Sequence, residues 1–591
     1  MTLDGLLNRR NVIAASLAFI AVAGISAYFV FRRPPRVAME RYVPSSALAF
    51  VEIDSLSDLV DGLTDTKAWR ELAPVLGLSS QIRQIGLGAD LMGRTGLGPT
   101  EAVIAARSQY AIALTGVDAS TGETDEGPYI NFKPRFVLVA ETHAKPETVA
   151  GLLKERALLI AQRVYGESVV EESRDHHGSP LMVFHGPAPD RVLVAASAGS
   201  VALIGNNSEA MTLCLDAIAG RSPSLAGDET LKQRRSSVDR DASIFAFVTE
   251  SGVGKLAELG PAIIASRTQA SPDRASSFAD LIRNVSKETV AGLLYAAELT
   301  SDGVTERYLT ILRPRVAESL LPAFHAAGSH SSRSLSLVPR DAREVTVLNI
   351  DRIGELPERA LKQIAPNLDI VAAVALREFV ISFRKQYGFE ANDSAGDAVG
   401  DEVALADLGD GKPRVMLLSV RDKARLTQFV ERHLGQDGAA VTDESYNGTE
   451  IRLSSIDKHG AAGFIGDYLA LGARDQIARM IDTAANGDGL LTADQFKRAR
   501  GTNGPIVTFR LEKDDAGRLM LGISKLTRVT DGSPKLLESE AVRDARERLP
   551  MTVASTEFRD YGVYSETRSA VGNLSWLAAL LGGSDGDEEE M

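Results

Sequence analysis

Cysteine and aromatic residues are scarce in this chain of 591 residues. It has one cysteine, Cys214, and Phe, Trp and Tyr together make up 6% of it. A single cysteine excludes an intrachain disulfide framework and any metal site built from several cysteines. Cys214 lies in the apolar stretch MTLCLDAI, whose pattern predicts a buried thiol on a helix. With 44% hydrophobic and 24% charged residues, the chain is predicted to be globular, with two or more domains.

An excess of positive charge is also missing. Lys and Arg number 65 against 79 Asp and Glu, which gives a formal net charge of −14. This charge repels nucleic acid unless the basic groups gather into one strong patch, and the sequence contains no such cluster. We therefore expect no nucleic-acid partner.

The common catalytic signatures are absent. The sequence contains neither Gly-x-Ser-x-Gly nor His-Glu-x-x-His, so the usual hydrolase routes lack their nucleophile or their metal. The stretch ESGVGKLAEL at 250–259 lacks the Ser or Thr that a phosphate-binding loop needs for magnesium. The Ser-x-x-Lys spacing from Ser455 to Lys458 has no Lys-Thr-Gly to complete it. The sequence therefore predicts no catalytic residue, no cofactor-binding residue and no cofactor.

One long apolar run is present. Residues 12–31, VIAASLAFIAVAGISAYFVF, are 20 residues without a charge, and as a helix they would span roughly 30 Å of hydrocarbon. They predict a transmembrane helix in contact with membrane lipid. A cleavable signal peptide is the competing interpretation, because Ala21-Val22-Ala23 fits a small-x-small cleavage pattern. The apolar run continues past Ala23 to Phe31, which favours a retained anchor.

The charges around this run give opposing indications of orientation. Arg9 and Arg10 precede it, while Arg32, Arg33 and Arg36 follow it, so the positive-inside rule does not favour an exported body. The Arg9-Arg10 pair resembles a twin-arginine export signal, which would place the N-terminus inside. We expect a single-pass membrane protein with its body outside the cytoplasm.

The body contains an internal repeat. Apolar, β-branched runs alternate with helical patterns, and the strands SPLMVFHG and DRVLVAAS are joined by too short a turn for a crossover, which predicts antiparallel pairing. KPRFVLVA at 133 matches KPRVMLLS at 412. AELTSDGVTER at 297 matches TEFRDYGVYSE at 556, with Gly303 opposite Gly562 in a predicted hairpin turn.

This repeat sets the predicted organisation. The fold class is α+β, with two tandem copies of an antiparallel-sheet-plus-helices unit behind one N-terminal transmembrane helix. The predicted segments are an N-terminal tail (1–11), the transmembrane helix (12–31), a spacer (32–42), the first repeat (43–313), a linker (314–337), the second repeat (338–580) and an acidic tail (581–591).

The stretch DTAANGDGLLTADQF at 482–496 resembles a calcium-binding loop. With Gly489 at the sixth position of such a loop, Ala484 takes the first position and Gln495 the twelfth, so the first carboxylate and the bidentate acid are both missing. The matching segment of the first repeat, 216–232, has Leu225 opposite Leu491 and lacks the Gly-Asp-Gly. We predict a structural turn without calcium.

A second candidate for metal binding is the cluster DHHG at 175–178, with His185 beyond it. The matching positions of the second repeat read SYNG, in which Asn447-Gly448 is a strong hairpin-turn signal. We therefore interpret His176 and His177 as surface turn residues rather than metal ligands. The sequence predicts no metal site.

One family resemblance follows from these patterns. The apolar run, then VPSSALAFVEIDSL at 43, then the paired elements SPSLAGDETLK and GLLTADQFK, resemble the bacterial domain-of-unknown-function family thirty-three fifty-two. The resemblance implies a membrane-anchored envelope protein with a duplicated α+β body, and it supplies no catalytic residues. The inserted acidic loop DASTGETDEGPY departs from the pattern.

The function expected from the sequence is that of a non-enzymatic binding or scaffolding module of the bacterial envelope, with an envelope protein, peptide or lipid as partner. The alternative is an envelope hydrolase or transferase whose active site matches no common motif.

Overall fold

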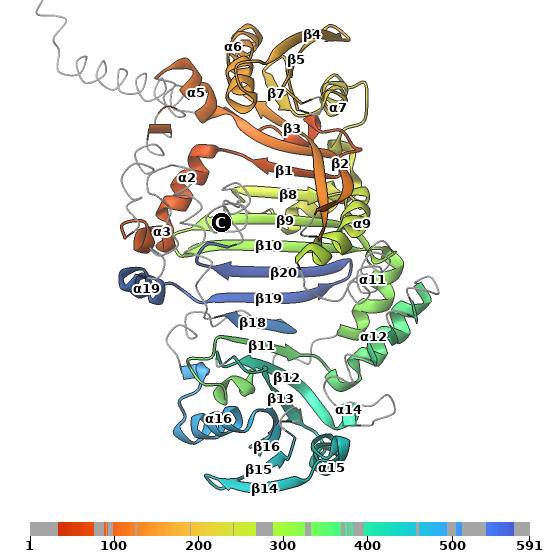
Figure 1. Cartoon of the computed structure of the whole chain (residues 1–591), viewed down its shortest axis with the longest axis vertical. Coiled ribbons are helices and arrows are strands. Elements are labelled where there is room, and N and C mark those ends of the chain that lie inside the picture. The colour runs from red at the N-terminus through yellow and green to blue at the C-terminus, as the bar shows by residue number, and fades with distance from the viewer. Residues whose placement is uncertain are drawn as a thin grey trace, which may run out of the picture.

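The structure is a computed structural model. It describes residues 34–75, 98–124, 127–188, 191–239, 242–267, 288–324, 332–367, 395–409, 411–456, 460–492, 504–510 and 539–572, with a few isolated residues between these ranges. Its strands form one antiparallel 20-stranded sheet that runs along the molecule (Figure 1).

The strands of the first half are β1 (Ala49–Ile53), β2 (Gln109–Thr124), β3 (Gly127–Glu141), β4 (Val170–His176), β5 (Ser179–His185), β6 (Val192–Ala198), β7 (Val201–Gly205), β8 (Ile244–Val248), β9 (Val290–Thr300) and β10 (Gly303–Leu312). Those of the second half are β11 (Glu344–Asn349), β12 (Val399–Asp407), β13 (Val415–Val420), β14 (Val441–Tyr446), β15 (Thr449–Ser454), β16 (Ala461–Ile465), β17 (Tyr468–Gly472), β18 (Ile506–Arg510), β19 (Thr552–Arg559) and β20 (Gly562–Ser569).

The α-helices are α2 (Leu56–Asp65), α3 (Lys67–Leu72), α5 (Thr100–Arg107), α6 (Pro146–Tyr165), α7 (Ser208–Ile218), α8 (Glu229–Arg234), α9 (Glu250–Arg267), α11 (Pro314–Leu320), α12 (Leu356–Ile364), α14 (Ala395–Ala398), α15 (Lys423–Leu434), α16 (Arg474–Asn486) and α19 (Glu540–Glu547).

The strand pairing has the same pattern in both halves. In the first half β1 pairs with β2 and β8, β3 with β2 and β7, and the chain of pairs continues through β6 and β5 to β4. In the second half β11 pairs with β12 and β18, β13 with β12 and β17, and the pairs continue through β16 and β15 to β14. The halves join where β10 pairs with β20. The strand order of the second half, read outward from β20 to β14, therefore repeats that of the first half, read outward from β10 to β4.

The fold class predicted from the sequence is therefore wrong as stated. The prediction was two tandem α+β units behind a transmembrane helix, whereas the strands of both halves share one sheet with helices around it. No helix in the described part of the chain is long and apolar enough to cross a membrane. Residues 12–31, like 1–11 and the acidic tail 581–591, lie outside the described residues, so the location outside the cytoplasm stays a prediction.

Two predicted connecting segments are packed parts of the body. The spacer 32–42 ends in a 3-10 helix, η2 (Met39–Tyr42), and the Met39 side chain is fully buried in the core of the first half. The linker 314–337 contains α11, and its residue Leu335 is fully buried in the core of the second half. The stretch HAAGSHSSRSLSL within 314–337 is rich in Ser and His, a composition typical of a linker, but described apolar residues of this segment pack into the cores on either side.

The register of one matched pair differs from the sequence alignment by one residue. The alignment placed Val415 opposite Phe136. In the structure Val415 pairs with Ala406 of β12. At the matching position of β2, Ala113 pairs with Val137 and not with Phe136. Val137 and Val415 are both fully buried, whereas Phe136 is 37% exposed. An irregularity between Leu114 and Gly116 in the β2–β3 pairing shifts the first half, and a shift of one residue reverses which side chains face the core.

Each end of the sheet forms a three-layer lobe. In the first lobe (β2 to β7 with α5, α6 and α7), α6 packs on one face through Leu153 and Ala157, and α7 packs on the other through Met211 and Leu215. In the second lobe (β12 to β17 with α14, α15 and α16), α15 packs on one face of the sheet and α16 packs on the other, so that each helix belongs to a separate core. Figure 1 shows the two lobes at the top and bottom, with the central strands between them.

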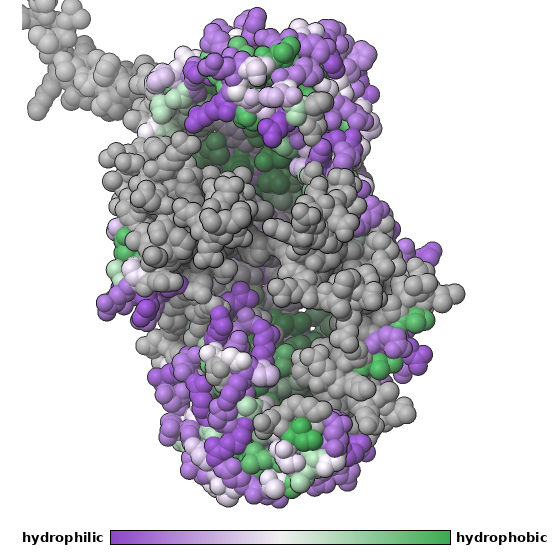
Figure 2. All heavy atoms as spheres, viewed as in Figure 1, coloured by the Kyte–Doolittle hydropathy of each residue, from purple (hydrophilic) through white to green (hydrophobic). Residues whose placement is uncertain are grey.

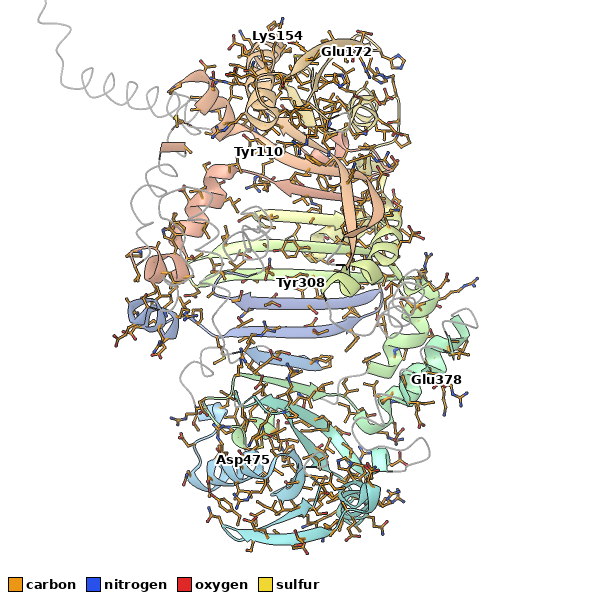
Figure 3. The ribbon with its side chains drawn as sticks, in the orientation of Figure 1. Tyr110, Lys154, Glu172, Tyr308, Glu378 and Asp475 are labelled. Carbon is orange, nitrogen blue, oxygen red and sulfur yellow. The ribbon has the colours of Figure 1, made fainter. Side chains whose placement is uncertain are left out.

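The outermost strands are charged. The sequence of β4 is VEESRDH, mostly exposed, and that of β14 is VTDESY. Glu172, labelled in Figure 3, lies on β4 at the top of the molecule. Charged side chains on an edge strand disfavour pairing with a strand of another chain.

Candidate functional site

The tip of the β4–β5 hairpin places two histidines over helix α7. His176 ends β4, and the turn to β5 consists of His177 and Gly178, which have φ of 54° and 84°. These positive values are those of a two-residue hairpin turn in which both central residues are left-handed. The Gly178 amide donates to Oδ1 of Asp175 at 3.0 Å. Both imidazoles are thereby held at the hairpin tip.

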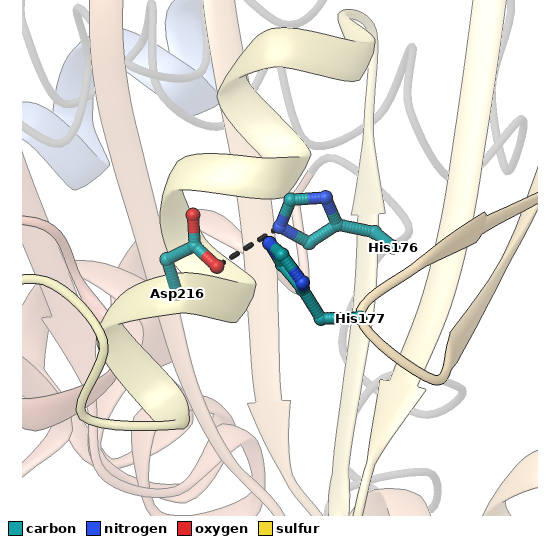
Figure 4. Close-up of side chains that lie close together, drawn as sticks. All are labelled: His176, His177 and Asp216. Atoms are coloured by element: carbon teal, nitrogen blue, oxygen red, sulfur yellow. Dashed lines mark hydrogen bonds and ion pairs between the residues drawn. The ribbon is translucent and has the colours of Figure 1, made fainter.

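Helix α7 supplies the third group. Asn207 caps it by accepting a hydrogen bond from the Ala210 amide at 2.9 Å. Its buried face includes the predicted buried thiol of Cys214, which the structure confirms, and burial raises the pKa of this thiol to about 12. Asp216, two residues further along, points away from the core toward the hairpin (Figure 4).

The three side chains meet at one point. Nε2 of His176 lies 2.9 Å from Oδ1 of Asp216, and the ring centroids of His176 and His177 are 4.6 Å apart in an edge-to-face arrangement. One possible ligand atom from each residue lies within 4.8 Å of the others. Arg221 donates through Nε to the same Oδ1 at 2.8 Å. The hydrogen bonds from Arg221 and then His176 lower the pKa of Asp216, so its carboxylate is ionised at neutral pH.

The second lobe has the same tether with other residues. Tyr446 donates to Oδ2 of Asp482 at 2.9 Å, and Asn447 donates to Oδ1 at 2.7 Å. Asn447 has φ of 49°, close to that of His177. The hairpin tip is thus bound to a helical aspartate in both lobes, but only the first lobe uses imidazoles for it.

The sequence located the two histidines but missed Asp216 as their partner. His176 and Asp216 are 40 positions apart, and the available signal was that Asp216 and Asp482 match in the two repeats. His185, which had been grouped with them, lies at the far end of β5 and contacts Glu172 at 3.1 Å. Within the described residues, His176, His177 and Asp216 form a group that could hold a metal ion.

The calcium-like loop is engaged in backbone and ionic contacts. Asp488 forms an ion pair with Arg340 at 2.5 Å, and Gly489 makes an isolated β-bridge with Pro339. The Leu490 amide donates to the Val338 carbonyl at 2.8 Å. Leu225 in the first half makes the equivalent hydrogen bond to the carbonyl of Val43.

These contacts correct one aligned pair. In the first half the Leu225 amide donates to the Val43 carbonyl at 2.9 Å, so Leu225 corresponds to Leu490 and not to Leu491. Counted from the matching residues Asp216 and Asp482, the second loop therefore has one residue fewer before this leucine than the first. Asp494 and Gln495 lie outside the described residues.

A buried tyrosine–glutamate pair near β3 resembles an acid–base site. Tyr42 donates to Glu141 at 2.5 Å, and His143 lies beside it with Nδ1 4.0 Å from Oε1. Burial and then the contacts with Glu141 raise the pKa of Tyr42, and burial lowers the pKa of His143. In the second half Tyr468 donates to the buried Glu402 at 2.9 Å, from different strands. Glu402 also accepts a hydrogen bond from the Ser334 amide, in the segment before β11, at 2.9 Å. Because a buried glutamate bonded to a tyrosine recurs with other residues, we interpret it as a structural contact that ties the sheet to the segments before β1 and β11.

The other near-motifs take structural positions. Residues 250–259 lie in helix α9. Ser455 lies in a bend after β15, and its hydroxyl oxygen accepts a hydrogen bond from the Ala440 amide. Lys458 lies outside the described residues, as do His325 and His330, two histidines of the predicted linker 314–337 that could serve as bases. These segments show no convergence of a nucleophile with a base among the described residues.

An apolar groove lies between α5 and α6. Its volume is about 240 Å³, and Ile104, Leu152 and Leu153 line it together with Tyr110 and Ala140 from the sheet. The Tyr110 hydroxyl donates to the Ala105 carbonyl at 3.0 Å, and the Ser108 hydroxyl to the Ile104 carbonyl at 2.8 Å. Figure 3 labels Tyr110 in the upper part of the molecule, where the same view in Figure 2 shows hydrophobic residues in a hollow.

No protein-family model, no curated protein and no solved structure matches this chain. The resemblance to the bacterial domain-of-unknown-function family thirty-three fifty-two therefore stays a prediction, and the geometry of the molecule itself must carry the functional argument.

Proposed function

We propose that the protein is a non-enzymatic binding module, and that the first lobe holds an apolar segment of a protein partner in the groove between α5 and α6. The single observation that supports this is a groove with an apolar lining whose polar groups are already hydrogen-bonded within the protein. A location in the bacterial envelope belongs to the same proposal and rests on the sequence alone.

The size of the groove favours a side chain over a small molecule. Pockets for drug-sized ligands are usually about 300–1,000 Å³, and this groove has about 240 Å³. At its mouth Arg156 forms an ion pair with Glu101, so no unpaired charge is offered to a ligand there. Burial of an apolar side chain is then the main source of binding free energy, at roughly 25 cal/mol for each Å² of apolar surface removed from water.

Helix α6 continues the apolar surface beyond the groove. It has 20 residues, and Leu159, Ile160 and Val164 near its C-terminal end are 51%, 38% and 58% exposed. Three large apolar side chains within two helical turns form an apolar strip, which is typical of an interaction surface. Lys154, labelled in Figure 3, lies on the same helix.

The second lobe lacks this surface. Its corresponding helix, α15, has 12 residues and ends at Leu434. The large apolar residues of α15 are buried, and its exposed positions are polar, as at Arg425, Gln428 and Glu431. The difference between the lobes supports a role for the α6 strip that is separate from folding.

The proposal is tested by photo-crosslinking in cells. A photoreactive amino acid at position 164 is expected to crosslink to one protein, and the same group at position 428 of α15 is not. Leu152→Glu, which puts a charge into the groove, is expected to abolish the crosslink without lowering the melting temperature, and Gln428→Glu leaves the crosslink intact. Equal crosslinking from positions 164 and 428, or a crosslink that survives Leu152→Glu, would overturn the proposal.

A further inference from the structure

The hairpin tether of the first lobe has chemistry that its counterpart lacks. Tyr446 and Asn447 hold Asp482 with donated hydrogen bonds alone. His176 and His177 present nitrogen atoms with lone pairs, and these can bind a metal ion. Retention of the turn does not require histidine, because the second lobe makes the same turn without one.

The turn position itself disfavours histidine. His177 has φ of 54°, in the left-handed region, where asparagine is the better suited non-glycine residue in a hairpin turn. The second lobe has Asn447 there, with φ of 49°. His177 also lies against His176 instead of pairing with a carboxylate of its own turn. Two imidazoles beside one carboxylate are a common ligand set for transition-metal ions.

From these observations we propose that His176, His177 and Asp216 bind a divalent transition-metal ion of the zinc class, at a site separate from the α5–α6 groove. His176 coordinates through Nε2 as a neutral imidazole with its proton on Nδ1, His177 through one ring nitrogen, and Asp216 through its carboxylate. Water completes the coordination. Calcium and magnesium are disfavoured, because they prefer oxygen ligands.

The local structure permits this binding with small movements. The ligand atoms lie within 4.8 Å of one another, and tetrahedral coordination at about 2.0–2.2 Å from a common ion needs separations of roughly 3.3–3.6 Å. The His176 and Asp216 atoms therefore move slightly apart from 2.9 Å, and the His177 atom moves closer. The ion takes the place of the His176–Asp216 hydrogen bond. Arg221 must swing away from Oδ1 of Asp216, and its side chain, 37% exposed, can turn toward solvent. His177 is exposed, so an ion reaches the site from outside.

Metal binding connects two elements of the first lobe. The histidines belong to the β4–β5 hairpin and Asp216 belongs to α7, which packs on the core through Met211 and Leu215. A bound ion therefore holds the hairpin tip to the core more firmly than the single hydrogen bond does. We expect slower exchange of the amide hydrogens in β4 and β5 when metal is present.

The experiment is calorimetric titration of the purified, chelator-treated full chain without an affinity tag. Zn²⁺ is expected to bind with one equivalent at this site, and Ca²⁺ is not. The double variant His176→Tyr/His177→Asn installs the residues of the second lobe, so it is expected to fold and to lose this equivalent. As a matched control, His185→Asn keeps it.

The reverse substitution gives an independent check. Tyr446→His/Asn447→His places the same ligands beside Asp482, and it is expected to add a second equivalent of Zn²⁺. Absence of Zn²⁺ binding by the unmodified chain overturns the proposal. Unchanged stoichiometry in His176→Tyr/His177→Asn, with circular dichroism showing a folded protein, overturns it as well.

Discussion

Arg307 and Glu566 lie directly opposite each other where β10 pairs with β20, and they are the corresponding residues of the two halves. Nε of Arg307 is 3.6 Å from Oε2 of Glu566. A symmetric dimer has two copies of one residue at such a point, which places like charges together if the residue is charged. Two halves in one chain differ in sequence, and here the opposed positions have opposite charges. Tyr308, labelled in Figure 3, marks this junction in the middle of the sheet.

We expect the charges at this junction to contribute to stability. The Arg307 side chain is 11% exposed and also contacts Glu298 at 2.7 Å. Arg307→Met removes the cation that pairs with Glu298, and it takes one of two arginines from Glu566, which keeps its contact with Arg568 at 2.8 Å. We expect it to lower the free energy of unfolding by about 2 kcal/mol. Arg307→Glu places like charges together and is expected to lower it further. Urea denaturation measures both losses.

The charge-reversed double variant is the control for this pair. Glu566→Arg added to Arg307→Glu restores opposite charges across the junction, and we expect it to recover part of the loss caused by Arg307→Glu alone. A double variant no more stable than Arg307→Glu would show that the pair does not contribute.

Buried Glu52 is expected to make stability depend on pH. Burial raises its pKa to about 7, although Arg235 donates to its Oε2 at 2.7 Å and opposes the shift. In the unfolded chain the carboxyl has its ordinary value of 4.5. Between pH 4.5 and 7 the folded chain thus binds more protons, so the free energy of unfolding falls as pH rises, by about 3 kcal/mol over this range from this group.

The variant Glu52→Gln isolates this contribution. It has no proton to lose, so its free energy of unfolding should fall less steeply between pH 4.5 and 7 than that of the unmodified chain. Urea denaturation at several pH values measures the two slopes. Parallel curves for the two proteins would contradict the assignment.

The backbone around Gly489 should not accept a side chain. A Cβ at this position would lie 2.2 Å from the Ser336 carbonyl oxygen, whereas a Cβ at Gly227 in the first half would meet nothing within 4 Å. We expect Gly489→Ala to lower the free energy of unfolding by about 1–3 kcal/mol. Gly227→Ala serves as the control and should change it little. Similar melting temperatures for the two variants would contradict the close packing of this loop.

Calcium should leave the protein unchanged. Asp488 is paired with Arg340 at 2.5 Å, and Gly489 is held by its bridge to Pro339, so the loop is built without an ion. A calcium site filled at a hundredfold excess over its Kd would add about 2.7 kcal/mol to the free energy of unfolding. We expect no change in melting temperature on adding Ca²⁺. A rise that disappears in Asp488→Ala would show that the loop binds calcium.

Local signals in the sequence predicted many individual elements. The Asn447-Gly448 pair is the turn between β14 and β15, and Gly303 and Gly562 each begin the second strand of a hairpin, β10 and β20. Burial of Cys214 followed from the apolar residues around it. Turns and faces of this kind depend on a few neighbouring residues, so they can be predicted from the chain alone.

The candidate metal site could be predicted only in part. The sequence showed His176 and His177 together, but it did not show that the hairpin tip lies over the last turn of α7, where Asp216 is 2.9 Å away. The match of Asp216 with Asp482 was visible, while the partner of each aspartate was not. That partner depends on how hairpin and helix pack on the sheet between them.

By itself the sequence determined the repeated succession of strands and helices, because the two halves have similar apolar spacing and matching turn glycines, as at Gly303 and Gly562. Only the tertiary structure decided that both halves form one sheet, that Val415 takes the place of Val137, and that Arg307 meets Glu566. The alternation of side chains specifies which face of a strand is buried, but it does not specify the neighbouring strand. Neighbours are chosen by backbone hydrogen bonds and core packing between segments far apart in the chain, and these exist only in the folded molecule.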